Sequence, residues 1–364
     1  MRVSIPTIPH TITTSGIQRR TISPAAAVER IADFLAPGNV TLLTGAGVSV
    51  ASGIRAYRGK DGRYMNPNYQ PIFYHELVDE SEKGFAFRKV IRPSFYPIAF
   101  ELVTQQAAVL TDYTIRRSHT SGSHTVSENI YLNCTELFMY VADRLRAHFP
   151  RFGGQVTNPS CLQRVHCKRG HVVPRDVFQD WLSASNPQWK AFVDNLERTG
   201  QKPRTNPDGD VELEGVSYAD FVVPACPECI LEGERNSVHK PEVIFFGESI
   251  PGQMKNRSFF DIERSGRVFV LGTTLATYSA FRLVKRALEL RKPVLLLNVG
   301  PTRADGLPGV EKLEISSSLV LRDAVRALLG SRASQDPAIV HLLQSGIHQP
   351  PPEDHNIISN KTST

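Results

Sequence analysis

Residues 40–59 read VTLLTGAGVSVASGIRAYRG, and this stretch decides the fold class. The run from Val40 to Leu43 is apolar and rich in β-branched residues, which is typical of a buried parallel strand. It leads directly into Gly45-Ala46-Gly47. A strand that ends in a glycine turn and opens a helix begins a nucleotide-binding βαβ unit. One glycine permits a tight turn, and the other lets the backbone approach a phosphate near the helix N-terminus.

The glycine turn alone leaves two interpretations open, a nucleotide site and an ordinary tight turn. The fingerprint of nicotinamide-dependent dehydrogenases also requires a third glycine three residues after the second. Position 50 is valine, so that fingerprint is not met. An unrelated enzyme with a similar nucleotide-binding loop is the least favoured interpretation.

The C-terminal half repeats the order of strand and helix. Helical spacing of apolar residues predicts three helices, at 24–36, 279–290 and 319–329. Short apolar runs predict two further strands, at 267–271 and 293–297. This alternation predicts an α/β fold of the Rossmann-like type, a parallel sheet wound by helices on both faces. Residues 167–229 are richer in charge, proline and turn residues, and predict a small inserted module.

Bulk composition limits the classes of function. The chain has 364 residues, of which 41% are hydrophobic, and a formal net charge of +6. No window approaches the roughly 18 apolar residues of a membrane-spanning helix, so we expect no membrane span. The positive charge is scattered, without a dense Lys/Arg run, so we expect no nucleic acid partner. These features indicate no particular oligomeric state.

The two ends of the chain differ from its centre. Residues 1–28 contain three arginines, eight Ser or Thr and no Asp or Glu, a composition typical of a mitochondrial transit peptide, with a polar disordered N-terminus as the alternative. We therefore expect residues 1–24 to be a transit peptide or disordered, and the protein to lie in the mitochondrial matrix, with a cytoplasmic or nuclear location as the alternative. The polar tail at 331–364, with three consecutive prolines, is expected to be disordered.

The run from Thr44 to Gly59, TGAGVSVASGIRAYRG, resembles the signature of the sirtuin family, from which it departs at Arg55 and Ala56. Further stretches resemble the family: NPDGDV (206–211), KPEVIFFGE (240–248), GTTLATYS (272–279) and NVGPTRAD (298–305). They are most similar to class II sirtuins, the mitochondrial sirtuin-four group. The resemblance implies a catalytic domain over residues 25–330, with its small module at about 160–240.

The resemblance implies the binding site for NAD. The residues that it places around NAD are Gly45, Ala46, Gly47, Ser49, Gly53, Ile54, Tyr57, Arg58, Gly272, Thr273, Thr274, Asn298 and Gly300. It also implies that an acyl-lysine peptide pairs with the segment Val243, Ile244, Phe245, Phe246, Gly247 and Glu248. Aromatic residues in a strand are usually core, and both interpretations of Phe245 and Phe246 can hold because successive side chains face opposite ways.

Sirtuins carry a structural zinc ion between two Cys-x-x-Cys pairs. The second pair is intact here as Cys226 and Cys229, whereas Gly170 stands where the partner of Cys167 belongs. His171 follows directly, so the sequence predicts a zinc site of three cysteines and one histidine. The alternative is an exposed His171 and a weak or absent metal.

The likeness is interrupted over residues 89–161. The family motifs Thr-Gln-Asn-x-Asp and Leu-His-Gly are absent, and the position of the catalytic histidine falls on Pro159. His119, His124 and His148 lie in this segment and are expected to be ordinary surface residues. Three explanations compete: a wrongly joined or frame-shifted gene model, an NAD-binding pseudoenzyme, and an active enzyme with a divergent base. The catalytic residue is therefore unknown.

The resemblance implies an NAD-dependent protein-lysine deacylase, of deacetylase, lipoamidase or ADP-ribosyltransferase type, that acts on acyl-lysine proteins. The alternative is a catalytically impaired NAD-binding protein.

Overall fold

The computed structural model describes residues 22–50, 56–59, 62–65, 73–81, 164–199, 204–205, 211–212, 222–234, 237–241, 244–335 and 337–344. Its central sheet has four parallel strands in the spatial order β1-β7-β8-β9. Their bounds are β1 (Val40–Thr44), β7 (Arg267–Leu271), β8 (Val294–Leu297) and β9 (Val310–Leu313). The strands predicted at 40–43, 267–271 and 293–297 are confirmed to within one residue at either end.

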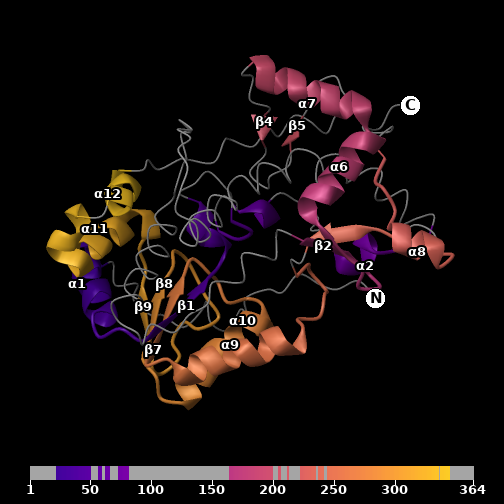
Figure 1. The fold of residues 1–364 in the computed structure, drawn as a ribbon. Coiled ribbons are helices and arrows are strands. Elements are labelled where there is room, and N and C mark those ends of the chain that lie inside the picture. The colour runs from indigo at the N-terminus through magenta and orange to yellow at the C-terminus, as the bar shows by residue number, and fades with distance from the viewer. Residues whose placement is uncertain are drawn as a thin grey trace.

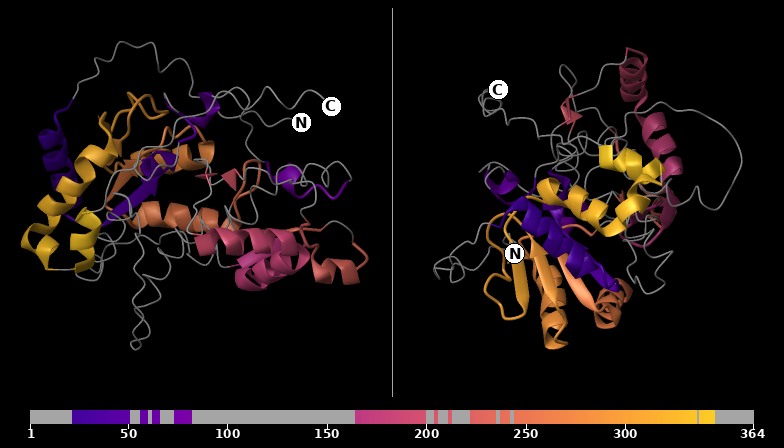
Figure 2. Two further views of the ribbon diagram at one scale, coloured as in Figure 1. Left: turned by 90° about the horizontal axis from the view of Figure 1, so that it is seen from above. Right: turned by 90° about the vertical axis from the view of Figure 1, so that its left-hand side faces the viewer.

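Helices cover both faces of this sheet, which confirms the predicted doubly wound α/β architecture (Figure 1). One face carries α1 (Pro24–Leu35), α11 (Ser317–Leu329) and α12 (Pro337–Gln344), and the other carries α9 (Gly252–Arg264) and α10 (Tyr278–Glu289). Figure 2 shows the two helical layers from the side and from above.

The apolar run of β7 serves both layers. Phe269 and Leu271 pack with the first group of helices, and Val268 and Val270 pack with the second. All four side chains are fully buried. Successive residues of a strand point to opposite faces, so a strand between two helical layers must be apolar throughout.

Ser23 and Pro24 explain where helix α1 begins. The hydroxyl of Ser23 accepts a hydrogen bond from the backbone N–H of Ala26 at 3.2 Å, and Pro24 occupies the first turn, where a missing N–H costs nothing. Arg30 reaches from the helix to Glu311 on β9 and forms a bidentate ion pair, with N–O distances of 2.7 and 2.6 Å.

Part of the segment expected to be disordered, from residue 331 onward, is helical in the structure. Residues 330–334 form the 3₁₀ helix η6 (Gly330–Ser334), and α12 follows it. Ile339 and Leu343 of α12 lie one turn apart and are both buried in the core beside α11. The polar composition of this region suggested that the conformational entropy lost on ordering would exceed any gain from burial. Burial of these two side chains against the helical layer offsets that loss.

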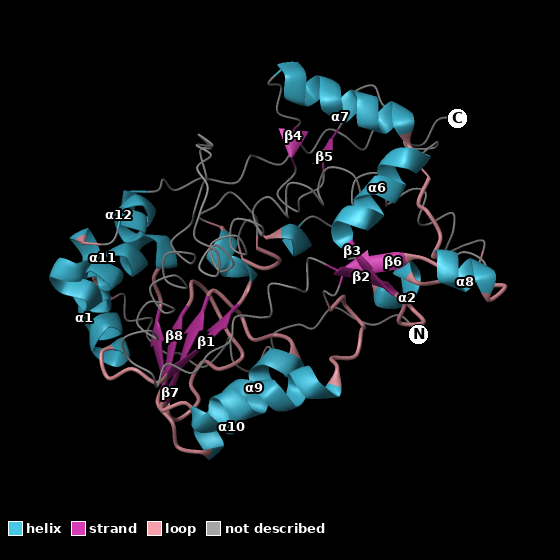
Figure 3. Ribbon diagram, viewed as in Figure 1, coloured by secondary structure: helices cyan, strands magenta, loops and turns pink. Residues whose placement is uncertain are grey.

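A second, smaller unit contains an antiparallel sheet of order β3-β2-β6. Its strands are β2 (Arg164–Cys167), β3 (Val172–Pro174) and β6 (His239–Pro241). Around this sheet lie α2 (Tyr74–Leu77), α6 (Arg175–Ser185), α7 (Pro187–Thr199) and α8 (Pro227–Leu231), and the short strands β4 (Arg204–Thr205) and β5 (Val211–Glu212) pair with each other. Figure 3 shows this unit apart from the parallel sheet.

Two further observations concern the predicted elements. The turn after β1 opens a 3₁₀ helix, η2 (Ala46–Ser49), within the part that the structure describes, in place of the predicted start of an α-helix. A second 3₁₀ helix, η3 (Arg63–Met65), follows further along the chain.

Among the described residues, no helix combines the length and the apolar character needed to cross a bilayer.

Candidate functional site

Three of the sequence-predicted turns meet at the carboxyl edge of the parallel sheet. Thr44 of β1 is paired with Leu271 of β7, and Leu271 with Leu297 of β8, so these strands end in register. The turns that follow are 45–47, 272–274 and 298–300. Ligands of open parallel sheets bind at this edge. The structure therefore brings together turns that lie far apart in the sequence.

The first two turns are joined by their backbones. The N–H of Gly45 donates to the carbonyl of Leu271 at 3.0 Å, and the N–H of Gly47 donates to the carbonyl of Gly272 at 2.8 Å. A Cβ added at Gly47 would lie 2.6 Å from the Gly272 carbonyl oxygen, and one at Gly45 would lie 2.4 Å from the Thr273 Cβ. The glycines are thus required for the two turns to touch, a role that the sequence analysis missed.

Gly272 is constrained in a second way. Its φ of +55° lies in the left-handed region that favours glycine, and an added Cβ would lie 2.6 Å from the backbone nitrogen of Val48. After it, the Thr273 hydroxyl accepts the N–H of Leu275 at 3.1 Å. The chain therefore turns sharply at the end of β7 and presents Thr273 and Thr274 at the sheet edge.

The third turn is braced by its own Asn298 and by Lys312, the second of which the sequence analysis did not single out. The buried Asn298 donates its side-chain amide to the carbonyl of Val299 at 2.9 Å, inside the turn. Lys312 of β9 donates to the Gly300 carbonyl at 2.7 Å and pairs with Asp305 at 2.9 Å. The signal in the sequence that could have revealed this brace is Lys312 in a short strand, with Asp305 and Glu314 as nearby carboxylates.

The loop that carries Tyr57 and Arg58 contacts the predicted substrate segment. The Tyr57 ring stacks on Tyr64 at 5.5 Å between centroids and meets the edge of Phe246 at 5.6 Å. The guanidinium of Arg58 lies 5.0 Å from the Tyr64 ring centre. Burial lowers the pKa of Arg58 from its ordinary value. Predicted cofactor and substrate residues therefore adjoin one another.

Within its described residues, 244–248, the predicted substrate segment is strand-like at one position. Strand β6 ends at Pro241, and Phe246 then forms one isolated parallel bridge with Phe73, in which the Tyr74 N–H donates to the Phe246 carbonyl at 2.8 Å. Phe246 faces Tyr57, whereas the Phe245 ring lies 5.2 Å from the Lys240 ammonium. The two adjacent aromatic side chains therefore contact different neighbours.

A buried ion pair fixes this segment to the small sheet. Lys240 is 2% exposed, and its Nζ lies 3.1 Å from Oε1 of Glu248. The other oxygen of Glu248 accepts the Phe245 N–H at 2.8 Å. One carboxylate thus links the substrate segment to β6, with the Tyr74 ring centre 5.7 Å from the same ammonium.

Some predicted residues lie outside the described part of the chain. These are Gly53, Ile54, Val243, Pro159 and the segment 89–161. Ser49 is described as part of η2.

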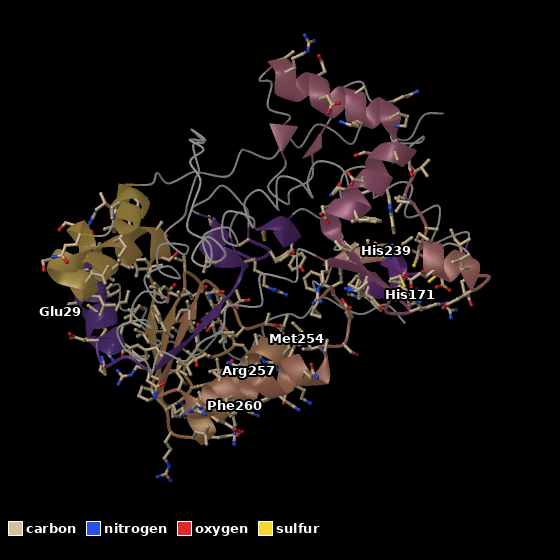
Figure 4. The ribbon with its side chains drawn as sticks, in the orientation of Figure 1. Glu29, His171, His239, Met254, Arg257 and Phe260 are labelled. Atoms are coloured by element: carbon tan, nitrogen blue, oxygen red, sulfur yellow. The ribbon has the colours of Figure 1, made fainter. Side chains whose placement is uncertain are left out.

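The four predicted metal ligands lie together at one end of the small unit. Sγ of Cys167, Cys226 and Cys229 lies 3.4, 3.5 and 3.3 Å, respectively, from Nδ1 of His171. The Sγ atoms of Cys167 and Cys229 are 3.7 Å apart. Figure 4 shows His171 among sulfur atoms beside α8.

Local structure explains how a histidine reaches this position. Cys167 ends β2, and the turn closes with the Gly170 N–H donating to the Cys167 carbonyl and the Cys167 N–H donating to the His171 carbonyl, both at 3.0 Å. Gly170 has a φ of +93°. Position 170 therefore makes the turn, and the longer imidazole of the next residue takes up the ligand position. Cys226 caps α8 and Cys229 lies one turn into it, so both sulfurs share a side.

The spacing fits a tetrahedral zinc ion. Zinc–sulfur and zinc–nitrogen bonds of about 2.3 and 2.05 Å require S···N and S···S separations of roughly 3.6 and 3.8 Å. The measured separations agree with these to within about 0.3 Å. Burial raises the pKa of the Cys229 thiol to about 12 and that of Cys226 above its usual value. A cation reverses that preference by stabilising the thiolates.

Comparison with known proteins identifies relatives of the chain. No family model matches it. It is 33% identical over 314 residues to NAD-dependent protein deacylase SIR4 of Batrachochytrium dendrobatidis, covering 82% of this chain and 93% of that protein. It is 32% identical over 291 residues to NAD-dependent protein deacylase SIR4 of Monosiga brevicollis, covering 79% and 85%. It is 30% identical over 296 residues to NAD-dependent protein deacylase SRT2 of Arabidopsis thaliana, covering 75% and 69%.

Solved structures of Sir2 enzymes are also similar. One, described as a Sir2 homologue in complex with ADP-ribose, has a TM-score of 0.46 and 18% identity, and covers 84% of this chain and 98% of that one. From the identity and coverage of its relatives, the chain belongs to the sirtuin family of NAD-dependent protein deacylases, in the group that resembles SIR4.

Proposed function

We propose that this protein is an NAD-dependent protein-lysine deacylase. The observation that carries the proposal is the meeting of the turns 45–47, 272–274 and 298–300 at the carboxyl edge of the sheet. The names of the relatives, all NAD-dependent protein deacylases or deacetylases, support it. Held by these turns, NAD would supply an electrophilic ribose carbon as the acceptor of the acyl group, with nicotinamide as the leaving group.

The residues at the sheet edge fit such a dinucleotide. Among the proposed cofactor residues that the structure describes, none carries a carboxylate, and Arg58 is cationic. The hydroxyls of Thr273 and Thr274 are donors suited to phosphate and ribose oxygens, and the side-chain oxygen of Asn298 can accept a hydrogen bond from a ribose hydroxyl. This donor set agrees with a negatively charged diphosphate flanked by two sugars.

The proposed roles follow the positions of these residues. Gly45–Gly47, Ser49 and Gly53, with Ile54, border the diphosphate and ribose. Thr273 and Thr274, after Gly272, hold ribose or phosphate oxygens, and Asn298 with Gly300 holds the adenosine ribose. Tyr57 and Arg58 cover the nicotinamide half, where Tyr57 also contacts Phe246.

We propose that the substrate is an acyl-lysine protein segment that lies along 243–248. Backbone groups of an extended peptide pair with those of the segment, and Phe246 lines the space that takes the acyl-lysine side chain, next to Tyr57. The Lys240–Glu248 pair holds the Phe245 backbone in place for this pairing.

A structural zinc ion completes the proposal. Three thiolates and the His171 imidazole would hold it, and its part is to lock a unit that has little core of its own.

We further propose that residues 25–330 form the catalytic domain, with this unit at about 160–240, and that residues 1–24 direct import into the mitochondrial matrix. A fusion of residues 1–30 to a fluorescent protein tests the last point: it co-localises with mitochondria if the proposal is right and stays diffuse if it is wrong.

A second candidate function is NAD binding without turnover. Pro159 stands at the position of the family's catalytic histidine, and proline has no side-chain base. The family motifs that border this position are also absent between residues 89 and 161. Re-sequencing of the transcript distinguishes a faulty gene model, in which case the missing motifs are restored, from a true pseudoenzyme.

One experiment separates the two functions. The zinc-loaded full chain is incubated with NAD and acetyl- or lipoyl-lysine peptides, and nicotinamide is quantified by chromatography, with the unmodified peptide as control. The deacylase predicts release that depends on the acyl-peptide. The non-catalytic candidate predicts background release together with measurable NAD binding. Absence of both contradicts the two candidates alike.

A further inference from the structure

The imidazole of His171 has polar neighbours on both of its nitrogens. Nδ1 faces the three cysteine sulfurs at 3.3–3.5 Å. Nε2 lies 3.5 Å from Oε2 of Glu228 and 3.5 Å from Oε1 of Glu232. Each nitrogen therefore has a distinct partner, sulfur on one side and carboxylate on the other.

The two carboxylates come from α8, the helix that also carries Cys229. Glu228 lies in the first turn and Glu232 is the cap residue, and the Glu232 N–H donates to the Glu228 carbonyl at 3.0 Å. Residues four apart in a helix lie on one side of it. The helix therefore presents a pair of carboxylates to the outer side of His171, whose side chain is 19% exposed.

Zinc chemistry makes this arrangement consequential. A neutral imidazole that binds zinc through Nδ1 must carry its proton on Nε2, where it donates to a second group. Carboxylates beside Nε2 stabilise that tautomer, hold the ring in orientation and raise the basicity of the ligand nitrogen. A thiolate at the same place would instead be repelled by the carboxylates.

We propose that Glu228 and Glu232 are positioning residues that make His171 a competent zinc ligand, and that they specify histidine over cysteine at this fourth position. The proposal rests on the zinc site proposed above and deepens it. The carboxylates touch the ligand and not the metal. They therefore act through His171, on the strength with which it binds zinc, and are not themselves ligands of the metal.

The size of the effect follows from exposure. Loss of a polar partner that orients a zinc ligand costs roughly 10- to 100-fold in metal affinity. At 3.5 Å the two contacts of Nε2 are ion-pair contacts, longer than an ordinary hydrogen bond. The Glu228 and Glu232 side chains are 61% and 50% exposed, so water screens them. We therefore expect the low end of that range, about tenfold for the double variant Glu228→Gln/Glu232→Gln and less for either single change.

Competition with a chromophoric chelator measures zinc affinity of the full chain directly. Glu234→Gln is the matched control, since Glu234 pairs with Arg169 in the same unit and its substitution removes the same kind of charge. The proposal predicts a loss of about tenfold for the double glutamine variant and a loss of less than about twofold for the control. Equal affinity of the double variant and the wild type overturns the proposal while the zinc site stands. If the wild-type protein binds no zinc, the zinc site falls and the proposal falls with it.

A second background tests the specificity for histidine. In His171→Cys, the two glutamine substitutions should strengthen zinc binding, because they remove repulsion from a thiolate. The sign of their effect is thus opposite in the two backgrounds, and a weakening in both contradicts the proposal. The visible spectrum of the cobalt-substituted protein should be the same in the wild type and the double glutamine variant at saturation. A changed spectrum would make a glutamate a metal ligand and overturn the positioning role.

Discussion

Replacement of Lys240 by methionine tests the buried ion pair that fixes the proposed substrate segment. Methionine keeps the apolar stem and removes the ammonium 3.1 Å from Glu248 Oε1. Glu248 is then left as a carboxylate that is 13% exposed and still accepts the Phe245 N–H. The substitution therefore isolates one buried charge without opening a large cavity.

The expected cost is large. At 3.1 Å and an effective dielectric constant of about 20, the attraction between the two charges is about 5 kcal/mol. Loss of one partner of a buried pair costs about 3–5 kcal/mol, against a total unfolding free energy of about 5–15 kcal/mol. We expect Lys240→Met to lower the free energy of unfolding by about 3–5 kcal/mol. The double variant Lys240→Met/Glu248→Gln should recover most of this, because no charge then stays buried alone.

Urea denaturation of the zinc-loaded protein measures these values. Lys190→Met is the matched control, since its pair with Asp194 is exposed and both side chains are 56% accessible. It should change the free energy of unfolding by less than about 0.5 kcal/mol. A loss below about 1 kcal/mol for Lys240→Met, or a double variant no more stable than the single, would refute the reasoning.

Three further predictions concern the turns, the small unit and its histidine. Gly47→Ala should lower NAD affinity at least about tenfold and cost roughly 2–4 kcal/mol of stability, because its Cβ meets the Gly272 carbonyl at 2.6 Å. Gly252→Ala adds a Cβ with nothing within 4 Å of it. It should leave the NAD affinity in calorimetry and the free energy of unfolding in urea denaturation unchanged. Chelation of zinc should change the tryptophan fluorescence, since Trp181 and Trp189 belong to α6 and α7 of the small unit, and leave the far-ultraviolet signal of the parallel sheet largely intact. Burial lowers the pKa of His239 to about 4, whereas an unfolded histidine has a pKa of about 6.5. Because the unfolded chain therefore takes up this proton first, the free energy of unfolding should fall by up to about 3 kcal/mol between pH 6.5 and pH 4. If the pH profile of His239→Phe ran parallel to that of the wild type, this prediction would be contradicted.

The parallel sheet could be predicted from sequence because its strands are apolar on both faces. The run 267–271 has no polar residue after Arg267, and such a run between glycine turns has few alternatives to a buried strand. Helix α12 was missed for the converse reason. Its two core residues, Ile339 and Leu343, form a short pattern inside a polar region, and its stability comes from packing on α11 that no local signal reports.

The candidate site was predictable as a set of residues and not as an arrangement. Glycines 45 and 47 were expected to make room for a phosphate, whereas the structure shows that they make room for the distant turn at Gly272. His171 could be inferred as a candidate ligand because it directly follows Gly170, where the family has a cysteine. That Glu228 and Glu232 flank its other nitrogen depends on how α8 docks against the β2–β3 turn, which is tertiary information. Lys240 and Glu248 were visible within one quoted stretch, but that their side chains form an ion pair is tertiary information.

The central claim is that the carboxyl edge of the parallel sheet binds the diphosphate of NAD. Isothermal calorimetry of the zinc-loaded full chain with ADP-ribose tests it most directly, because ADP-ribose carries the diphosphate and both sugars and needs no catalytic base. We predict saturable binding of one ADP-ribose per chain that Gly47→Ala weakens and Gly252→Ala leaves unchanged. Absence of heat and of thermal stabilisation at millimolar ADP-ribose, with a folded and zinc-loaded sample, would contradict the claim.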